Sequence, residues 1–554
     1  MADAPELRKA RGAYFTPPAI ADFLSRWAIG GNPQARVLDP SCGEAAFLVA
    51  AGARLRELGA GAPDPGRLVG VDVHEASLDA ARRELAAHGL RARLVAGDIF
   101  DLAPPGRPGA PLPAMDAVVG NPPFIRYQRH AGAARARARA AALAQGVTLS
   151  GLASSWAAVL VHACAFLRPE GRLAMVLPAE LLTVGYAEPV RQWLRRRFGR
   201  VSLILVERRQ FRDAQEKVVL LMAEGDGGCD AFALRPVGDA RELEDLPAAG
   251  APDVAPAAAG KWTGMLLPPR ARELLGRVMG GRFVPLGEYG RPELGTVTGA
   301  NRFFALSEET RRRFGLAESQ LARISPPGTR HLRGLAFDGG DWSGLRDAGA
   351  PVWLLHPDPA DRSAALRRYL AHGEALGVPA AYKCRVRTPW WRPPLVPVPD
   401  LFFTYMSHRH PRLVENRAGV SLVNSMHGVR LRPGAPPSAR AALPALALGA
   451  VTTLGAELHG RAYGGGVLKM EPREAATLPV PAPPALEDAW ALLRRERGRL
   501  DRALRAGEWA AVAERVDAVL LERVCGLRDE EVAALREAAA GLRARRLGRG
   551  PSPA

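Results

Sequence analysis

The tetrapeptide Asn121-Pro122-Pro123-Phe124 carries the residue types that point most directly to chemistry. Two prolines restrict the backbone, so the amide oxygen of Asn121 and the carbonyl oxygen of Pro122 can converge on one donor. A planar exocyclic NH2 group offers two hydrogens, and accepting both would direct its nitrogen lone pair towards an incoming methyl group. The ring of Phe124 supplies a flat face for a base. The pattern indicates a site that grips an amine, and a proline-rich turn with a buried phenylalanine is the plainer alternative.

Three acidic residues, each placed where a predicted strand ends, suggest a nucleoside site. Asp39 begins a turn that reaches Gly43 and leads into a helix, which lets backbone amides approach a ligand. Asp72 ends the next strand, where it can accept from ribose hydroxyls, and Asp98 follows the third, where it can accept from an adenine amine. The turn lacks the G-x-G-x-x-G pattern, which disfavours a dinucleotide. Each acid taken alone could equally be a helix cap.

These residues require a sheet that brings several strand ends to one edge. From residue 36 to residue 222, short β-rich runs alternate with helix-length segments such as Glu75–His88 and Trp156–Leu167. Apolar strands separated by helices predict an α/β fold, with a parallel sheet covered on both faces and ligands at the carboxyl strand ends. We expect strands at Arg36–Asp39, Leu68–Asp72, Arg93–Val95, Ala117–Gly120, Arg172–Leu177, Ser202–Val206 and Val218–Met222.

The chain changes character after the predicted sheet. Residues 225–260 combine glycines, an acidic stretch and a run rich in Pro and Ala, which indicates an interdomain connection. The following region is richer in proline, glycine and aromatic side chains and suggests irregular structure with short strands. Near the C-terminus, apolar residues recur at helical spacing, namely Trp509, Val512, Val516, Val519 and Leu520. We expect a ligand-binding α/β domain over residues 1–245, a mixed α+β domain over 261–484 and a helical segment over 485–554.

Length and composition exclude several classes of protein. With 554 residues, 47% hydrophobic and 24% charged, the chain is expected to be globular, with more than one domain. No window of about 18 apolar residues predicts a membrane span, and the N-terminus lacks the apolar core of a secretory signal. The five cysteines are scattered without a C-x-x-C pair, so neither a disulfide framework nor a zinc site is expected. We expect a cytoplasmic protein with no metal and no membrane partner.

The charge balance indicates an anionic partner. Lys and Arg number 75 against 57 Asp and Glu, which gives a formal net charge of +18, and only five of the basic residues are lysine. A codon bias contributes to the arginine excess, so single arginines say little, but the net charge is physical. Nucleic acid is the simplest polyanion to expect, and a basic protein without such a partner is the alternative.

The motifs and their order resemble the gamma group of adenine-N6 DNA methyltransferases. The resemblance rests on Gly12-Ala-Tyr-Phe-Thr-Pro-Pro18, Asp39-Pro-Ser-Cys-Gly43, Val71-Asp72, Gly97-Asp98 and Asn121-Pro-Pro-Phe124. Four later segments are similar to the recognition half of TaqI-like members, and they begin at Thr296, Tyr382, Asn424 and Tyr463. The resemblance covers most of the chain. It implies a Rossmann-like, seven-stranded class I methyltransferase domain, followed by a target-recognition domain with a helical C-terminal tail.

The resemblance also implies S-adenosylmethionine as the methyl donor. By carry-over, Thr16 and Asp39 hold its methionine end, Asp72 holds the ribose and Asp98 holds the adenine ring. The neighbouring residues that complete this pocket are Pro40, Cys42, Gly43 and Ile99. One departure stands out, because the family usually has a second turn glycine where this chain has Ala45. The methionine end of the pocket is therefore expected to be slightly reshaped.

The target amine is expected to be held by the tetrapeptide. The resemblance implies that Asn121 and Pro122 grip the amine, with Pro123 shaping the turn. It also implies that Phe124 stacks on the target base from one side and Phe211 from the other. A base inside a duplex cannot reach the donor, so it must flip out at a cost of a few kcal/mol.

The second half of the chain contains candidate DNA-binding residues. Cations lie beside aromatic residues in one segment, and an Asn and a His follow further along. Arginine reads guanine edges and phosphates, so some of these residues are expected to specify sequence. A domain core is an equally good explanation for the tryptophans, and a lone histidine is more often structural. The candidates are Lys383, Arg385, Arg387, Trp390, Trp391, Asn424 and His427.

We therefore expect a site-specific adenine-N6 methyltransferase that acts on double-stranded DNA as a monomer, in restriction-modification or phage defence. The sequence has no Walker P-loop, and none of its lysines follows an acid by two residues as in the common nuclease fold, so cleavage would belong to a separate restriction endonuclease. An RNA adenine methyltransferase and a non-catalytic DNA-binding specificity subunit are the alternatives. A protein glutamine methyltransferase shares the tetrapeptide but does not need a basic second half.

Overall fold

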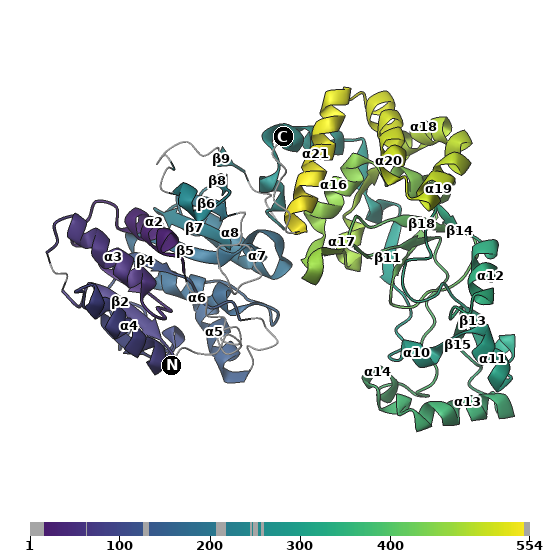
Figure 1. Cartoon of the computed structure of the whole chain (residues 1–554), viewed down its shortest axis with the longest axis horizontal. Helices are drawn as coiled ribbons and strands as arrows, with labels where there is room; N and C mark the ends of the chain where they lie inside the picture. The colour runs from purple at the N-terminus through teal and green to yellow at the C-terminus, as the bar shows by residue number, and fades with distance from the viewer. Residues whose placement is uncertain are drawn as a thin grey trace. The chain divides into compact units, whose positions relative to one another are not determined.

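The computed structural model describes residues 16–61, 64–125, 132–206, 218–243, 246, 253–255 and 260–547. The chain divides into two compact units, Met1–Leu266 and Leu267–Ala554 (Figure 1). Each unit has its own sheets and its own buried apolar residues, and each is described separately below.

The first unit is built on one large sheet. Nine strands of the described residues join it in the order β3-β2-β1-β4-β5-β7-β6-β8-β9. Most residues of β4, β5, β6 and β7 are buried regardless of which face they point to, so the sheet is covered on both faces. The strands are β1 (Val37–Asp39), β2 (Leu68–Asp72), β3 (Arg93–Ala96), β4 (Met115–Gly120), β5 (Leu167–Pro178), β6 (Arg200–Val206), β7 (Val218–Glu224), β8 (Phe232–Val237) and β9 (Asp253–Val254).

Helices connect these strands. The helix α2 packs on α3 and on the strands β4 and β5, while α6 packs on α5 and β5. A short 3-10 turn, η1 (Ile99–Asp101), follows β3. The α-helices are α2 (Pro18–Ile29), α3 (Ala46–Glu57), α4 (Glu75–Ala87), α5 (Gly132–Ala144), α6 (Ser155–Ala163), α7 (Glu180–Thr183) and α8 (Glu188–Arg197).

The order of the strands creates a switch point at the centre of the sheet. Both neighbours of β1 run parallel to it, with β2 on one side and β4 on the other. The chain moves outwards from β1 through β2 to β3, and then returns to the other side of β1 as β4. In open α/β sheets, ligands bind beyond the carboxyl strand ends at such a point.

All seven predicted strands are present, but two predictions about this region are wrong. The sheet is not wholly parallel, because β7 lies antiparallel between β5 and β6. The stretch 225–260 is not simply a connection, because β8 and β9 add to the edge of the sheet. Burial of Phe232, Leu234 and Val237 against the first core explains why this segment pairs with it.

The second unit contains several small sheets. The largest has five strands in the order β11-β19-β16-β18-β14, and β12-β15-β13 and β17-β21-β20 form two smaller sheets. The strand β10 pairs with β22. The strands are β10 (Phe283–Pro285), β11 (Gly290–Leu294), β12 (Ala305–Leu306), β13 (Leu321–Arg323), β14 (Ala336–Phe337), β15 (Trp353–Leu355), β16 (Leu401–Phe403), β17 (Met406–Ser407), β18 (Leu413–Asn416), β19 (His427–Leu431), β20 (Arg461–Tyr463), β21 (Val467–Lys469) and β22 (Pro479–Pro481).

The C-terminal helices pack within this second unit, where α21 lies against α16 and α19 lies against α20 (Figure 1). On α20 and the π-helical turn after it, Val512, Val516, Val519 and Leu520 are buried, as their spacing predicts. The helices of the unit are α9 (Pro269–Met279), α10 (Asn301–Phe304), α11 (Glu308–Phe314), α12 (Gly339–Asp347), α13 (Ala364–Ala375), α14 (Tyr382–Arg385), α15 (Ala439–Leu446), α16 (Ala450–His459), α17 (Pro472–Ala476), α18 (Pro483–Leu493), α19 (Arg497–Ala506), α20 (Trp509–Asp517) and α21 (Asp529–Arg546).

Within the described residues, no single helix combines the length and the apolar composition of a membrane span. The helices α15 and α16 meet such a test only when they are taken together across a 79° bend.

Gly70 on β2 gives a direct test of how tightly the first sheet is packed. A Cβ atom at Gly70 would lie 2.8 Å from both Cys42 Sγ and Leu48 Cδ1. We expect Gly70→Ala to lower the free energy of unfolding of this unit by about 1–3 kcal/mol, because overpacking forces neighbours to move. Denaturant titration would measure the loss. Gly31→Ala is the control, since a Cβ there meets nothing within 4 Å, and an equal loss in both variants would contradict the packing argument.

Candidate active site

The switch point brings Asp39 and Asn121 together. Asp39 is the last residue of β1, and Asn121 directly follows β4, which pairs with β1 in parallel register. The backbones approach so closely that a Cβ at Gly120 would lie 2.8 Å from Asp39 Oδ1. Glycine before the tetrapeptide is therefore a steric requirement of this neighbouring carboxylate. The first predicted acid and the predicted amine-gripping residue share one end of the sheet.

The tetrapeptide is held from two directions. Asn121 Nδ2 donates to Thr16 Oγ1 at 3.3 Å, and the Thr16 side chain is almost fully buried. The hydroxyl of Ser155, on the first turn of α6, donates to the carbonyl oxygen of Pro123 and accepts from the backbone N–H of Ile125 at 2.9 Å. These contacts fix the amide of Asn121 at one end of the turn and the backbone beyond Pro123 at the other.

Phe124 packs inwards at this point. Its side chain is only 9% exposed and joins the apolar core of the unit. A role in stacking on a target base remains a prediction for this ring. Phe211, the other predicted stacking residue, lies outside the described residues, as does the part of the first motif that precedes Thr16.

Asp39 lies in a strongly desolvated position. Its side chain is 1% exposed, and Oδ1 accepts one hydrogen bond from the backbone N–H of Ser41 at 3.1 Å. Burial raises the pKa of Asp39 to about 8, and the nearby Asp72 carboxylate adds to the increase. A desolvated carboxyl group of this kind is a good partner for a positively charged ligand group, because a cation would stabilise its ionised form.

The turn after Asp39 is tied to the second strand. The two carboxylate oxygens of Asp72 accept from the backbone N–H groups of Gly43 and His74, both at 2.9 Å. The backbone N–H of Cys42 donates to the carbonyl of Val71, also at 2.9 Å. The thiol of Cys42 is buried, and burial raises its pKa, so it remains protonated. Cys42 thus packs the turn, and Pro40 beside it is also buried.

Ala45 adopts the left-handed conformation that the resemblance assigns to a glycine. Its φ is 72°, and it is the single non-glycine residue of the described chain with a positive φ. Its methyl group is fully buried at the start of α3. A left-handed alanine costs roughly 1–2 kcal/mol relative to the ordinary conformation, so the turn holds strain that a glycine would not have.

Asp98, the third predicted acid, directly precedes the short turn η1, which contacts the helix α6. Asp98 Oδ1 accepts from the backbone N–H of Phe100 at 3.1 Å and so caps η1, while Ile99 is buried. The ring of His162 on α6 lies 3.0 Å from the carbonyl oxygen of Ile99, and burial lowers its pKa. Arg137 on α5 approaches Asp98 Oδ2 at 3.7 Å.

Ser155, His162 and Arg137 were not predicted from the sequence as parts of this site. Each comes from a helix that follows the tetrapeptide in the chain, and each contacts a strand-end loop that precedes it. Ser155 lies at the start of a predicted helix, where a serine ordinarily suggests a cap. Arg137 belongs to a regular run of arginines that predicts a solvated helix face. No local pattern in the sequence could have assigned these contacts.

Comparison with known proteins agrees with this geometry. Residues 2–198 match the family model described as N-6 DNA Methylase. Residues 259–521 match the model described as Type II methyltransferase M.Eco57I, C-terminal domain. Together the two models match more than four fifths of the chain. The first third of the chain thus matches the N-6 DNA methylases, and the second half of the chain matches the C-terminal domain of a type II methyltransferase. Its activity is the methylation of adenine in DNA, in the setting of restriction-modification.

The matches between this methylase and its relatives extend over both units. It is 24% identical over 483 residues to Type II methyltransferase M.XamI of Xanthomonas campestris pv. amaranthicola, a match that covers 85% of each chain. Among solved structures, the Type IIL restriction-modification enzyme MmeI in complex with DNA is matched at 13% identity and a TM-score of 0.53, over 98% of this chain and 80% of that one. This structural match supports the fold.

A further solved structure, the methyltransferase subunit of the type I restriction-modification system from Streptococcus thermophilus, is matched over 44% of the chain at 19% identity, with a TM-score of 0.34. The methylase spans half the length of that subunit.

The second unit of the methylase separates the predicted DNA-binding residues into two groups. Lys383 and Arg385 are exposed on the short helix α14. Arg387 instead donates to the carbonyl oxygens of Val297 and Thr298 at 3.0 and 3.1 Å. Its guanidinium therefore holds a neighbouring loop, and a contact of this half-buried cation with DNA stays a prediction.

Two of the other candidates, Trp390 and Asn424, also have structural contacts. Trp390 packs against Phe303 and Phe304, which supports the core explanation for this tryptophan, and Trp391 is half-buried. Asn424 Oδ1 accepts from the side chain of Asn301 at 3.2 Å and remains half-buried.

His427 cannot reach a base from its place in the structure. Its side chain is 0% exposed, with Nε2 3.0 Å from the carbonyl oxygen of Met470. The ring stacks on Tyr405 at a centroid distance of 4.3 Å, and burial lowers its pKa. The prediction that His427 reads DNA is therefore wrong, because the residue is fully buried at the start of β19, between β11 and β16.

Ser155 offers a test of how the tetrapeptide is positioned. We expect Ser155→Ala to lower kcat between about tenfold and about a hundredfold, because it frees two points of the backbone that orient the turn. The KM for the methyl donor should stay within about twofold, and Ser155→Thr should restore kcat. Steady-state kinetics would measure both constants. Ser150→Ala, which removes a hydroxyl that caps an exposed turn, is the control. A change in KM alone would contradict a positioning role.

Proposed function

We propose that the methylase transfers a methyl group from S-adenosylmethionine to the N6 amine of an adenine flipped out of duplex DNA at a defined sequence. The observation that carries this proposal is the close approach, across β1 and β4, of Asp39 to Gly120, the residue directly before Asn121. Asp39 is suited to a cationic cofactor group and Asn121 to a neutral amine. Both residues lie at the same end of two paired strands, which is the arrangement that transfer between two bound groups requires.

The acidic groups of this edge fit the proposed cofactor. When bound, S-adenosylmethionine supplies a methyl group already activated by its sulfonium. Asp39 and Thr16 would hold the methionine end, because a buried carboxylate suits an ammonium group. Asp72 would accept from the ribose hydroxyls with its remaining lone pairs, beside Gly43 and Pro40. Asp98 would accept from the adenine amine above Ile99, with Cys42 packed behind the turn.

The tetrapeptide is proposed to bind the target amine. The Asn121 side chain and the Pro122 carbonyl would each accept one amine hydrogen, with the amide held by Thr16. Stacking on aromatic rings contributes roughly 1–3 kcal/mol per base, which would offset much of the cost of flipping. Phe124 and Phe211 are the proposed rings. The reaction needs alignment and acceptors and no covalent intermediate, in keeping with the buried, protonated thiol of Cys42.

Duplex DNA is the proposed substrate, and the second unit is the proposed recognition domain. The net charge of +18 supports a polyanionic partner. Lys383 and Arg385 on α14 are the exposed candidates for contact with DNA. The similarity to type II methyltransferases supports a modification enzyme of restriction-modification. A separate restriction endonuclease, and binding to DNA as a monomer, complete the proposal.

The proposal is tested by transfer of labelled methyl from S-adenosylmethionine to unmethylated plasmid DNA of diverse sequence, followed by nucleoside analysis. Labelled N6-methyladenine at mapped positions would support the reaction, the target atom and the site specificity together. Label on the cytosine amine would contradict the base assignment. Label on RNA and not on DNA would contradict the substrate.

Asn121→Ala tests the proposed grip on the amine. We expect methyl transfer to fall by more than about a hundredfold, because one of the two acceptors for the amine is removed. Cofactor affinity should change by less than about threefold. Transfer assays and calorimetry would measure the two effects. Asn32→Ala is the control, because Asn32 contacts Asp116 at the opposite end of β4. Equal loss of cofactor binding and transfer would argue against this role.

The raised pKa of Asp39 predicts how cofactor binding depends on pH. Its carboxyl group, with a pKa of about 8, is mostly protonated at pH 7, whereas an ammonium partner favours the ionised form. Cofactor binding should therefore release close to one proton at pH 7, and affinity should rise between pH 6 and pH 8. Calorimetry in buffers of different ionisation enthalpy would count the proton. Asp39→Asn should abolish the release, and an unchanged proton count in this variant would refute the contact.

A further inference from the structure

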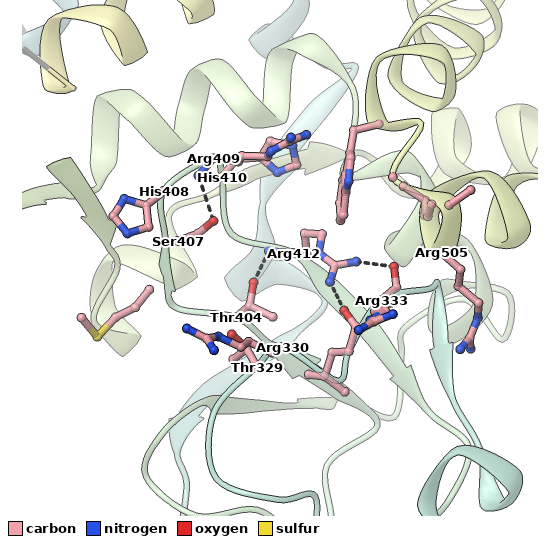
Figure 2. A pocket seen from close by; sticks show the side chains of 16 residues that line it. Thr329, Arg330, Arg333, Thr404, Ser407, His408, Arg409, His410, Arg412 and Arg505 are labelled. Carbon is pink, nitrogen blue, oxygen red and sulfur yellow. Dashed lines mark hydrogen bonds between the residues drawn. The ribbon is translucent and has the colours of Figure 1, made fainter. Parts of the chain in front are cut away.

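The second unit contains a cavity of about 430 Å³ outside the residues that the sequence predicts for DNA contact (Figure 2). Three separate segments build it: the loop 329–333, the segment 404–412, which contains β17, and the junction 504–509 between α19 and α20. Five arginines and two histidines line the cavity, together with hydroxyl groups, and its lining contains no aspartate or glutamate. We name this site the arginine cavity.

Most of its arginines have no acidic partner. Arg505 pairs with Asp341 and Asp501. Within the described part of the chain, the other four arginines of the cavity have no carboxylate within 4.0 Å, and they are Arg330, Arg333, Arg409 and Arg412. Like charges that line one cavity repel each other, so their gathering costs free energy that an anionic ligand would offset.

Arg412 lies at the centre of the arginine cavity (Figure 2). Its guanidinium stacks on the ring of Trp509 at 4.5 Å and donates to the carbonyl oxygens of Arg333 and Gly334 at 3.2 and 3.4 Å. Burial lowers its pKa to about 10. Even so it stays charged at neutral pH, which leaves a desolvated cation balanced only by carbonyl dipoles.

The positive charge of the arginines also affects the neighbouring His410. Burial, together with the charges of Arg412, Arg543 and Arg409, lowers the pKa of His410 to about 4. The backbone of the loop is fixed, because Thr404 and Ser407 accept from the N–H groups of Arg412 and Arg409 at 2.8 and 3.1 Å. The arginine cavity is therefore a preorganised positive site.

We propose that the arginine cavity binds a phosphate group of a nucleotide. Several guanidinium groups around one concave site match the oxygens of a phosphate, which they can bind in pairs. A backbone phosphate of the duplex and the phosphate chain of a free nucleotide present the same chemistry. The duplex is the expected source, because this methylase acts on DNA, and to that extent the inference rests on the proposed function.

The test removes charge from the rim of the arginine cavity. The variant Arg330→Gln/Arg333→Gln/Arg409→Gln changes three exposed arginines and leaves the packed Arg412 in place. The control is Arg494→Gln/Arg495→Gln/Arg502→Gln, which removes the same charge from exposed residues around α19 in the same unit. Equal melting temperatures of the two variants and the wild-type protein would establish that folding is intact.

Binding of a duplex that contains the methylated sequence is then measured against salt concentration. We expect the cavity variant to lose about tenfold to about a hundredfold in affinity at low salt and to show a slope shallower by about one unit, as for one lost phosphate contact. The KM for DNA should rise with kcat unchanged at saturating DNA. The control should change affinity by less than about threefold.

A second arm uses inorganic pyrophosphate, measured by calorimetry without DNA. Pyrophosphate binding to the wild-type protein and the control, but not to the cavity variant, with duplex affinity unchanged, would assign the site to a free nucleotide. Identical behaviour of the cavity variant and the control in both arms would overturn the proposal. If wild-type protein does not bind duplex at all, the proposed function fails, and the pyrophosphate arm still decides the cavity.

Discussion

The close approach of β1 and β4 is the constraint on which the active site depends. Parallel pairing places the end of one strand beside the end of the other, and Gly120 leaves room for the carboxylate of Asp39. That contact helps to bury the acid, whose pKa burial raises, and it also places the tetrapeptide next to the turn that follows Asp39. A larger residue at position 120 would push Asp39 away from the tetrapeptide that begins at Asn121. The remaining contacts of the site keep this arrangement rigid.

The sequence predicted this edge well because its signals are local. A strand ends, a glycine or proline turn follows, and a polar residue lies at the junction, so Asp39, Asp72, Asp98 and Asn121 could be placed at the strand ends from residue types and spacing alone. The supporting contacts could not be assigned, because they depend on which helix crosses which loop. Ser155 reaches the tetrapeptide from 32 residues beyond Pro123. The antiparallel direction of β7 was also missed, because an apolar strand has the same composition in either direction.

The second unit was harder to interpret because core and surface there use the same residue types. Arginine beside tryptophan suggests a DNA contact, yet Arg387 binds two backbone carbonyls and Trp390 packs on Phe303. An isolated histidine in an irregular region has no periodic pattern to place it, and His427 proved to be a buried strand residue. The exposed cations of α14 are of the same residue type as the internal Arg387. Only their position on a short helix at the surface distinguishes them.

The net charge says where DNA could bind only after the arginines that pair with carboxylates are separated from those that do not. Many arginines of the second unit are neutralised locally, as in the buried pair of Arg546 with Glu457 and the pair of Arg536 with Asp517. Such pairs fix the helices to each other and contribute little to the field outside. The excess that remains is uneven, and part of it gathers in the arginine cavity, whose lining holds no acid. A charge of +18 spread evenly would attract DNA without orienting it, whereas an excess concentrated at fixed points can set its register.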